Sequence, residues 1–63
     1  MADTFTLDFK SNTSTSSYKV KSKDVMDILT RDFRSQGYSI ITFGEKIREL
    51  EKGNHTVVIT KEN

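Results

Sequence analysis

The chain contains no cysteine, and this absence removes two supports that small domains commonly use. Without thiols there is no disulfide and no thiolate zinc site, and the single histidine, His55, cannot form a metal cage alone. A chain of 63 residues hides only about 60% of the surface that it exposes when unfolded, so its stability is marginal. We therefore expect an economical core or self-association to stabilise the domain, and we expect no metal and no cofactor.

Long apolar runs and an excess of charge of one sign are also missing. The longest apolar runs have two or three residues, whereas about 20 are needed to cross a bilayer. Residues 1–4 show no basic start followed by an apolar stretch, so we expect no secretory signal and a cytoplasmic location. Ten basic and nine acidic residues leave a net charge of +1, which provides no long-range field to attract nucleic acid or an anionic membrane.

Patterns typical of catalysis and nucleotide binding are absent as well. The three glycines, Gly37, Gly44 and Gly53, each lie near a predicted element boundary, so none belongs to a phosphate-binding loop. The serines show no Gly-x-Ser-x-Gly pattern. His55 has no second histidine, cysteine or flanking carboxylate pair with which to form a triad or a metal site. We expect no catalytic residues and no enzymatic activity.

The first third of the chain predicts a β-hairpin. Residues 4–10 alternate with period two, which is typical of a half-buried strand. The apolar positions of that strand are Phe5, Leu7 and Phe9. Residues 11–17 are short polar side chains that favour turns, and we expect them to form a flexible hairpin loop. Residues 18–21 alternate again, with Tyr18 and Val20 expected to face the core.

An amphipathic helix follows the hairpin. Ser22 is placed as its N-cap, so the helix is expected to begin at Lys23, and Gly37 is expected to end it in a left-handed conformation. Apolar residues recur at helical spacing and should form the buried face. They are Val25, Ile28, Leu29 and Phe33.

The second half of the chain leaves one element open. Residues 38–42, with Ile40 and Ile41 pointing to opposite faces, predict a short interior strand. Residues 43–52 are predicted as a second helix, because Thr42-Phe43-Gly44-Glu45 resembles a capping box and apolar residues follow at helical spacing. The alternative is a β-hairpin strand, since Lys52-Gly53-Asn54 suits a tight turn.

Residues 56–60 are rich in β-branched side chains and predict a closing strand, followed by a frayed tail over residues 61–63. The expected fold is a single compact domain over residues 1–63, of α+β class and two layers, in the order β-β-α-β-α-β. A helix-turn-helix fits poorly, because the segment between the two predicted helices is strand-like and the second helix would carry three glutamates.

Four lysines form the candidate contact surface: Lys10, Lys19, Lys21 and Lys23. They could follow the phosphates of a nucleic acid, but no exposed aromatic residue is interleaved with them for base stacking. Outward lysines also keep a sheet edge soluble and block its pairing. The primary hypothesis is therefore a regulatory or accessory protein that binds another protein through the edge of the first or last strand, an edge that could also form a homodimer. Nucleic-acid binding through the basic hairpin face is the alternative.

Overall fold

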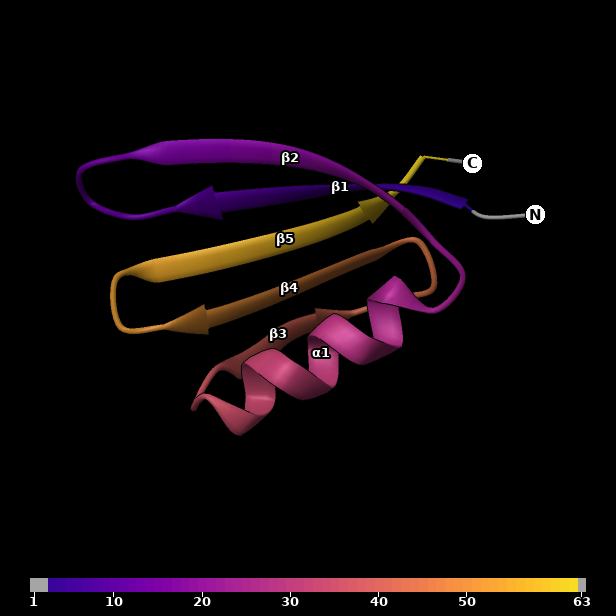
Figure 1. Cartoon of the computed structure of the whole chain (residues 1–63). Helices are drawn as coiled ribbons and strands as arrows, with labels where there is room; N and C mark the ends of the chain where they lie inside the picture. Colours follow the sequence, from indigo (N-terminus) through magenta and orange to yellow (C-terminus); the bar gives the residue numbers. More distant parts are fainter. Residues whose placement is uncertain (1–2, 63) are drawn as a thin grey trace.

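The strands lie in space in an order that differs from their order in the sequence. The computed structural model describes residues 3–62. Its elements are β1 (Asp3–Lys10), β2 (Thr15–Ser22), α1 (Val25–Ser35), β3 (Ser39–Phe43), β4 (Ile47–Lys52) and β5 (His55–Lys61). The strands form one antiparallel sheet in the order β2-β1-β5-β4-β3, and α1 packs on one face of it (Figure 1). The α+β class with two layers is therefore confirmed.

The edges of the sheet are β2 and β3, and this corrects two predictions. The first and last strands, expected at an edge, pair on both sides, whereas residues 38–42, expected as an interior strand, overlap the edge strand β3. The reason is that β5 inserts between β1 and β4. Its run Val57-Val58-Ile59 presents apolar groups to both faces, which suits a central strand better than the short β3.

The core lies between α1 and the central strands. Its fully buried side chains are Leu50, Val57 and Ile59. Leu7 lies directly opposite Ile59 in the β1–β5 register, so these side chains share the face of the sheet that α1 covers, here called the helix face. The remaining buried apolar residues of the core are Phe5, Leu7, Val25 and Met26. Burying each such side chain contributes about 1.5–3 kcal/mol, so these few positions carry most of the stability of the domain.

The N-terminal hairpin forms with a shorter loop than expected. Residues 11–14 make the turn, closed by a 2.9 Å hydrogen bond from the Ser11 N–H to the Ser14 carbonyl, and residues 15–17 belong to β2. The prediction that Tyr18 is buried is wrong, because its side chain is 56% exposed. Tyr18 belongs to the edge strand β2, and the ring of Phe9 packs edge-on against it, with the ring centroids 5.8 Å apart.

The helix begins two residues later than predicted. Ser22 is not its N-cap, because β2 continues to Ser22, which pairs with Asp3, and Asp24 occupies the N-cap position. The buried face is also rotated from the predicted one, since Ile28 is 52% exposed. The side chains that face the sheet are Val25, Met26, Leu29, Thr30 and Phe33. Successive helical residues turn by about 100°, so this face leaves Ile28 on the outer side.

The predicted end of the helix is confirmed at Gly37. This residue has a φ of 99°, a conformation that side chains with a Cβ rarely adopt. Its N–H donates to the carbonyl of Arg34, and the Tyr38 N–H donates to the carbonyl of Phe33. This is the Schellman pattern, and the rings of Phe33 and Tyr38, with centroids 5.0 Å apart, provide the apolar contact that accompanies it.

The second predicted helix does not form, and the hairpin alternative holds. Residues 44–46 make a turn and β4 follows, so the segment lies between β3 and β5 in the sheet. A capping box stabilises a helix end by only about 1 kcal/mol. In the strand, Leu50 is fully buried between Ile40 and Val57, and Gly53, with a φ of 60°, forms a tight turn. Together these two contributions outweigh the capping box.

The C-terminal end of the described chain is tied to the sheet. Lys61 is the last residue of β5 and pairs with Phe5, and the Glu62 N–H donates to the carbonyl of Thr4 over 3.0 Å. Asn63, the last residue of the predicted tail, lies outside the described residues, as do residues 1–2 of the predicted domain.

Candidate binding groove beside the edge strand β3

The edge strand β3 is exposed and carries no charge. All five of its residues are exposed, and the strand lies in an uncharged stretch that extends from Ser35 to Gly44. Its large apolar side chains include Ile41, 49% exposed, and Phe43, 63% exposed. The other edge strand, β2, carries Lys19 and Lys21. Since charged residues on an edge discourage pairing with another chain, only β2 is protected in this way.

A β-bulge in β3 determines which way Phe43 points. Ile40 lies opposite Leu50, but Thr42 lies opposite Glu49, so Ile41 is an extra residue in the β3–β4 pairing. In a regular strand, residues three apart lie on opposite faces. The bulge restores Phe43, which lies opposite Arg48, to the same helix face as Ile40. An aromatic ring is therefore placed beside α1 at the end of the edge strand.

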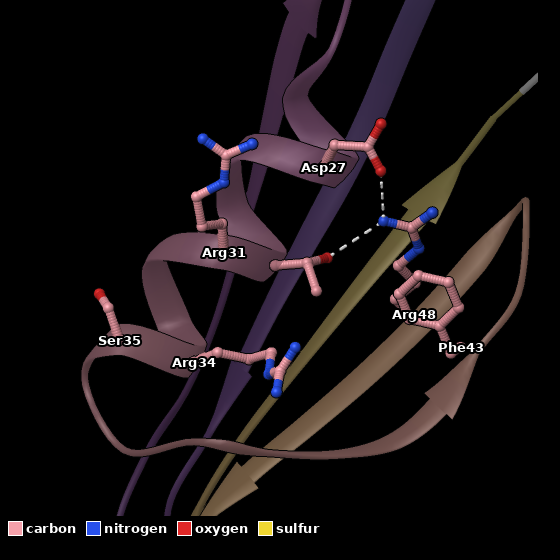
Figure 2. Close-up of a pocket in the computed structure, with 7 residues that line it drawn as sticks. Asp27, Arg31, Arg34, Ser35, Phe43 and Arg48 are labelled. Atoms are coloured by element: carbon pink, nitrogen blue, oxygen red, sulfur yellow. Dashed lines mark hydrogen bonds and ion pairs between the residues drawn. The ribbon is translucent and has the colours of Figure 1, made fainter.

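A groove of about 600 Å³ lies between α1 and the end of this strand pair (Figure 2). Five of its lining residues belong to α1, one to β3 and one to β4. They are Asp27, Thr30, Arg31, Arg34, Ser35, Phe43 and Arg48. The helical residues follow the spacing i, i+3, i+4, i+7 and i+8, which puts them along one side of the helix.

Arg48 joins the two walls of the groove. Its side chain is only 11% exposed. Its guanidinium donates to the Asp27 carboxylate over 2.8 Å, to the Thr30 hydroxyl over 3.3 Å and to the Gly44 carbonyl over 3.1 Å. The same guanidinium lies 4.1 Å from the ring centroid of Phe43. A buried charge is tolerated when it is paired and hydrogen-bonded, so Arg48 is a structural element of the groove.

Arg31 and Arg34 remain available for a ligand. Within residues 3–62, neither guanidinium has an ion pair or a hydrogen bond, and both residues are exposed. Figure 2 shows the side chain of Arg34 extending from α1 toward the gap between the helix and the strands. With Arg48 and Asp27 included, three positive charges and one negative charge give the groove a net charge of +2. The groove is thus more positive than the whole chain, whose net charge is +1.

The four lysines predicted as contact residues do not form one surface. Lys10, Lys19 and Lys21 alternate with the core residues of β1 and β2, so they lie on the sheet face opposite α1, here called the open face. Lys23 lies before α1 and lines a different groove, which also contains Asp3, Asp24, Asp27 and Glu45.

Carboxylates share the open face with the three lysines. Lys19 lies 3.8 Å from a Glu62 carboxylate oxygen, and Asp8 accepts a 2.7 Å hydrogen bond from Ser17. The strand register adds Glu49 and Glu51 of β4 to the same face. Three lysines therefore face four carboxylates. This balance weakens the attraction that the open face could exert on phosphates.

His55 is exposed at the start of β5, beside the turn at Gly53. It lines a smaller groove at the end of the N-terminal hairpin, together with Ser11, Ser14 and Tyr38. The sequence gives His55 no second histidine, cysteine or flanking carboxylate pair, and the structure places no carboxylate along that groove, which is lined by described residues only.

The sequence reasoning missed the groove between α1 and β3. Arg31 and Arg34 are not among the residues predicted for the buried face of the helix, although their spacing from Asp27 does mark one side of α1. Arg48 and Phe43 had been assigned to a helix that does not form. No local signal links Asp27 to Arg48, because the contact spans 21 residues and depends on how α1 crosses the sheet.

Comparison with protein-family models, with curated proteins and with solved structures finds no match to this chain. Within residues 3–62, the single helix is too short and too polar to cross a membrane.

Proposed function

We propose that the chain is a non-enzymatic regulatory or accessory protein that binds another protein by pairing a strand of that partner with β3. The observation that carries the proposal is the edge formed by β3, which is exposed, uncharged and rich in β-branched and aromatic side chains. An edge of this kind presents unpaired N–H and C=O groups, to which an extended segment can add as a further strand.

The contrast between the two edges supports the assignment of the binding strand. Both edges expose backbone groups, but β2 carries Lys19 and Lys21 while β3 carries no charge. The apolar side chains of Ile40, Ile41 and Phe43 lie along β3 and could contact side chains of an added strand. Main-chain hydrogen bonds would provide affinity, and these side chains would provide selectivity.

The experiment compares a charge on each edge. Ile41→Lys places a lysine on β3, and Thr15→Lys is the matched control on β2, since both side chains are exposed. Tagged wild-type chain and both variants are used for affinity capture from the native cell, and captured proteins are quantified by mass spectrometry. We expect at least one protein to be retained by wild type and by Thr15→Lys and lost with Ile41→Lys. Retention that does not differ between the two variants would overturn the proposal.

Circular dichroism of each variant tests whether it is folded. We expect Ile41→Lys to be folded, because Ile41 is half exposed. Sedimentation equilibrium of the wild-type chain identifies a homodimer, the version of the proposal in which the partner strand is β3 of a second copy. In that case Ile41→Lys should sediment as a monomer while Thr15→Lys remains a dimer.

Nucleic-acid binding is the second candidate, and it would use Lys10, Lys19 and Lys21 on the open face. The specific observation in its favour is that the register does place these three lysines on one face. The four carboxylates on that face make it the weaker candidate. Retention on DNA or RNA at low salt that disappears in Lys19→Glu/Lys21→Glu would support it over protein binding.

A further inference from the structure

We infer that the strand which pairs with β3 carries acidic side chains at alternate positions, on the side that faces α1. The inference rests on the proposed function, because it describes the partner of the same edge. It adds the chemical class of that partner, namely an acidic, strand-forming segment of another protein.

The side chains of a strand added to β3 would point alternately to the two faces of the sheet. A strand added to β3 would lie about 4.8 Å from it, and every second side chain would point to the helix face. Ile40 and Phe43 mark that face on β3. Phe43 also lines the groove with Arg31 and Arg34 of α1, so alternate side chains of the added strand would point toward this groove.

The free positive charge of the groove comes from two arginines of α1. Arg48 is occupied by Asp27, Thr30 and the Gly44 carbonyl, and it neutralises Asp27. Arg31 and Arg34, which lack such partners within residues 3–62, supply the net charge of +2. A guanidinium binds a carboxylate through two parallel hydrogen bonds. Glutamate or aspartate side chains at successive inward positions of a partner strand therefore fit this wall of the groove.

The positive charge of the groove disfavours a second copy of the chain as the partner. If two β3 strands paired about a two-fold axis perpendicular to the sheet, both helices would lie on the same side of the joined sheet. Each copy would then bring its own Arg31 and Arg34 toward the junction, and like charges brought together disfavour association. The uncharged edge and the positive groove together favour a different, acidic chain.

The outward side chains of the partner face a different environment. Ser39 and Thr42 lie on the open face of β3, opposite Glu51 and Glu49. Further carboxylates on that side would lie two strands from these glutamates, at about 10 Å, where like charges repel at low salt. The expected partner segment therefore alternates acidic residues with uncharged ones, instead of being acidic throughout.

The test uses three blocked seven-residue peptides that alternate threonine with glutamate, glutamine or lysine. Each is titrated into the 63-residue chain at low salt and followed by NMR. We expect the glutamate peptide to bind about tenfold or more tightly than the glutamine peptide, to shift β3 amides and the Arg34 side chain, and to lose this advantage at high salt. The lysine peptide should bind most weakly.

Charge reversal provides the matched variants. Arg31→Glu/Arg34→Glu should reverse the preference toward the lysine peptide, because it changes the net charge of the groove from +2 to −2. Both residues are exposed, so their replacement leaves the core intact. Lys19→Glu/Lys21→Glu, on the opposite face of the sheet, should leave the preference for glutamate unchanged. Inorganic phosphate should weaken binding of the glutamate peptide at β3 no more than sodium chloride does at the same ionic strength.

The outcomes separate the inference from the proposed function. Equal binding of the glutamate and glutamine peptides at β3 would overturn the inference and leave strand pairing supported. A greater loss of glutamate-peptide binding in phosphate than in sodium chloride at the same ionic strength would also overturn it, since the groove would then be a site for small anions. If none of the peptides shifts the β3 amides, strand pairing at this edge fails, and the acidic partner fails with it.

Discussion

The guanidinium of Arg48 lies over the ring of Phe43, 4.1 Å from its centroid, although the two residues belong to different strands and the ring is largely exposed. A cation over an aromatic face contributes about 0.5–1 kcal/mol at an exposed site. The contact exists because the bulge at Ile41 turns Phe43 to the helix face. It connects the edge strand to the hydrogen bonds that hold α1.

Replacement of Arg48 should destabilise the fold. Arg48→Met keeps most of the buried stem but leaves the Gly44 carbonyl and the Thr30 hydroxyl without this donor. We expect the free energy of unfolding to fall by about 1–3 kcal/mol, measured by urea denaturation. Arg31→Met, at an exposed position without such contacts within residues 3–62, should change it by less than about 0.5 kcal/mol. Equal effects of the two substitutions would contradict the structural role of Arg48.

Truncation of Leu50 should be far more severe. Its side chain is fully buried, so Leu50→Ala should cost about 2–5 kcal/mol, which is a large fraction of the stability of a small domain. Far-ultraviolet circular dichroism with temperature should show a strongly lowered melting temperature or no cooperative transition. Ile47→Ala, at an exposed position of the same strand, is the control and should leave a cooperative transition. A native-like melting curve for Leu50→Ala would contradict the assignment of β4 as a core strand.

Gly37 should resist replacement because of its backbone conformation. At a φ of 99°, Gly37→Ala should cost about 1 kcal/mol or more, measured by chemical denaturation. The three atoms nearest to the added Cβ belong to the flexible side chain of Lys52, at 3.4 Å or more, so the cost arises from backbone strain and not from a clash. A stabilising effect of Gly37→Ala would show that this helix end does not adopt the left-handed conformation.

The aromatic rings should show coupling only where they touch. Phe9 and Phe33 pack edge-on with centroids 5.9 Å apart, so a double-mutant cycle with leucine at both positions should give a coupling of about 0.5–1.5 kcal/mol. The control cycle pairs Tyr18 with Tyr38. Tyr18 contacts Phe9 and Tyr38 contacts Phe33, but among these ring contacts the two tyrosines do not touch each other. Its coupling should be close to zero. Similar couplings in both cycles would contradict this packing.

Local patterns in the sequence were sufficient to predict most of the helices and strands. The alternation of Phe5, Leu7 and Phe9 predicted β1, and Gly37 predicted the end of α1, because each signal acts within a few residues. Residues 43–52 carried two such signals that disagreed. Only the burial of Leu50 against Val57 decided between them, and that contact forms when β5 pairs with β4.

The candidate site shows the same division. The sequence by itself determined the class of the fold, the end of the helix at Gly37 and the uncharged character of residues 38–44, and it gave the turn at Gly53 as one of two alternatives. Tertiary structure decided that this uncharged segment contains an edge strand, that Ile28 and Tyr18 are exposed, and that Arg48 reaches Asp27. The physical reason is range: caps, turns and alternation depend on neighbours in the chain, whereas strand order, the rotation of a helix and a groove between two elements depend on contacts between residues far apart in the sequence.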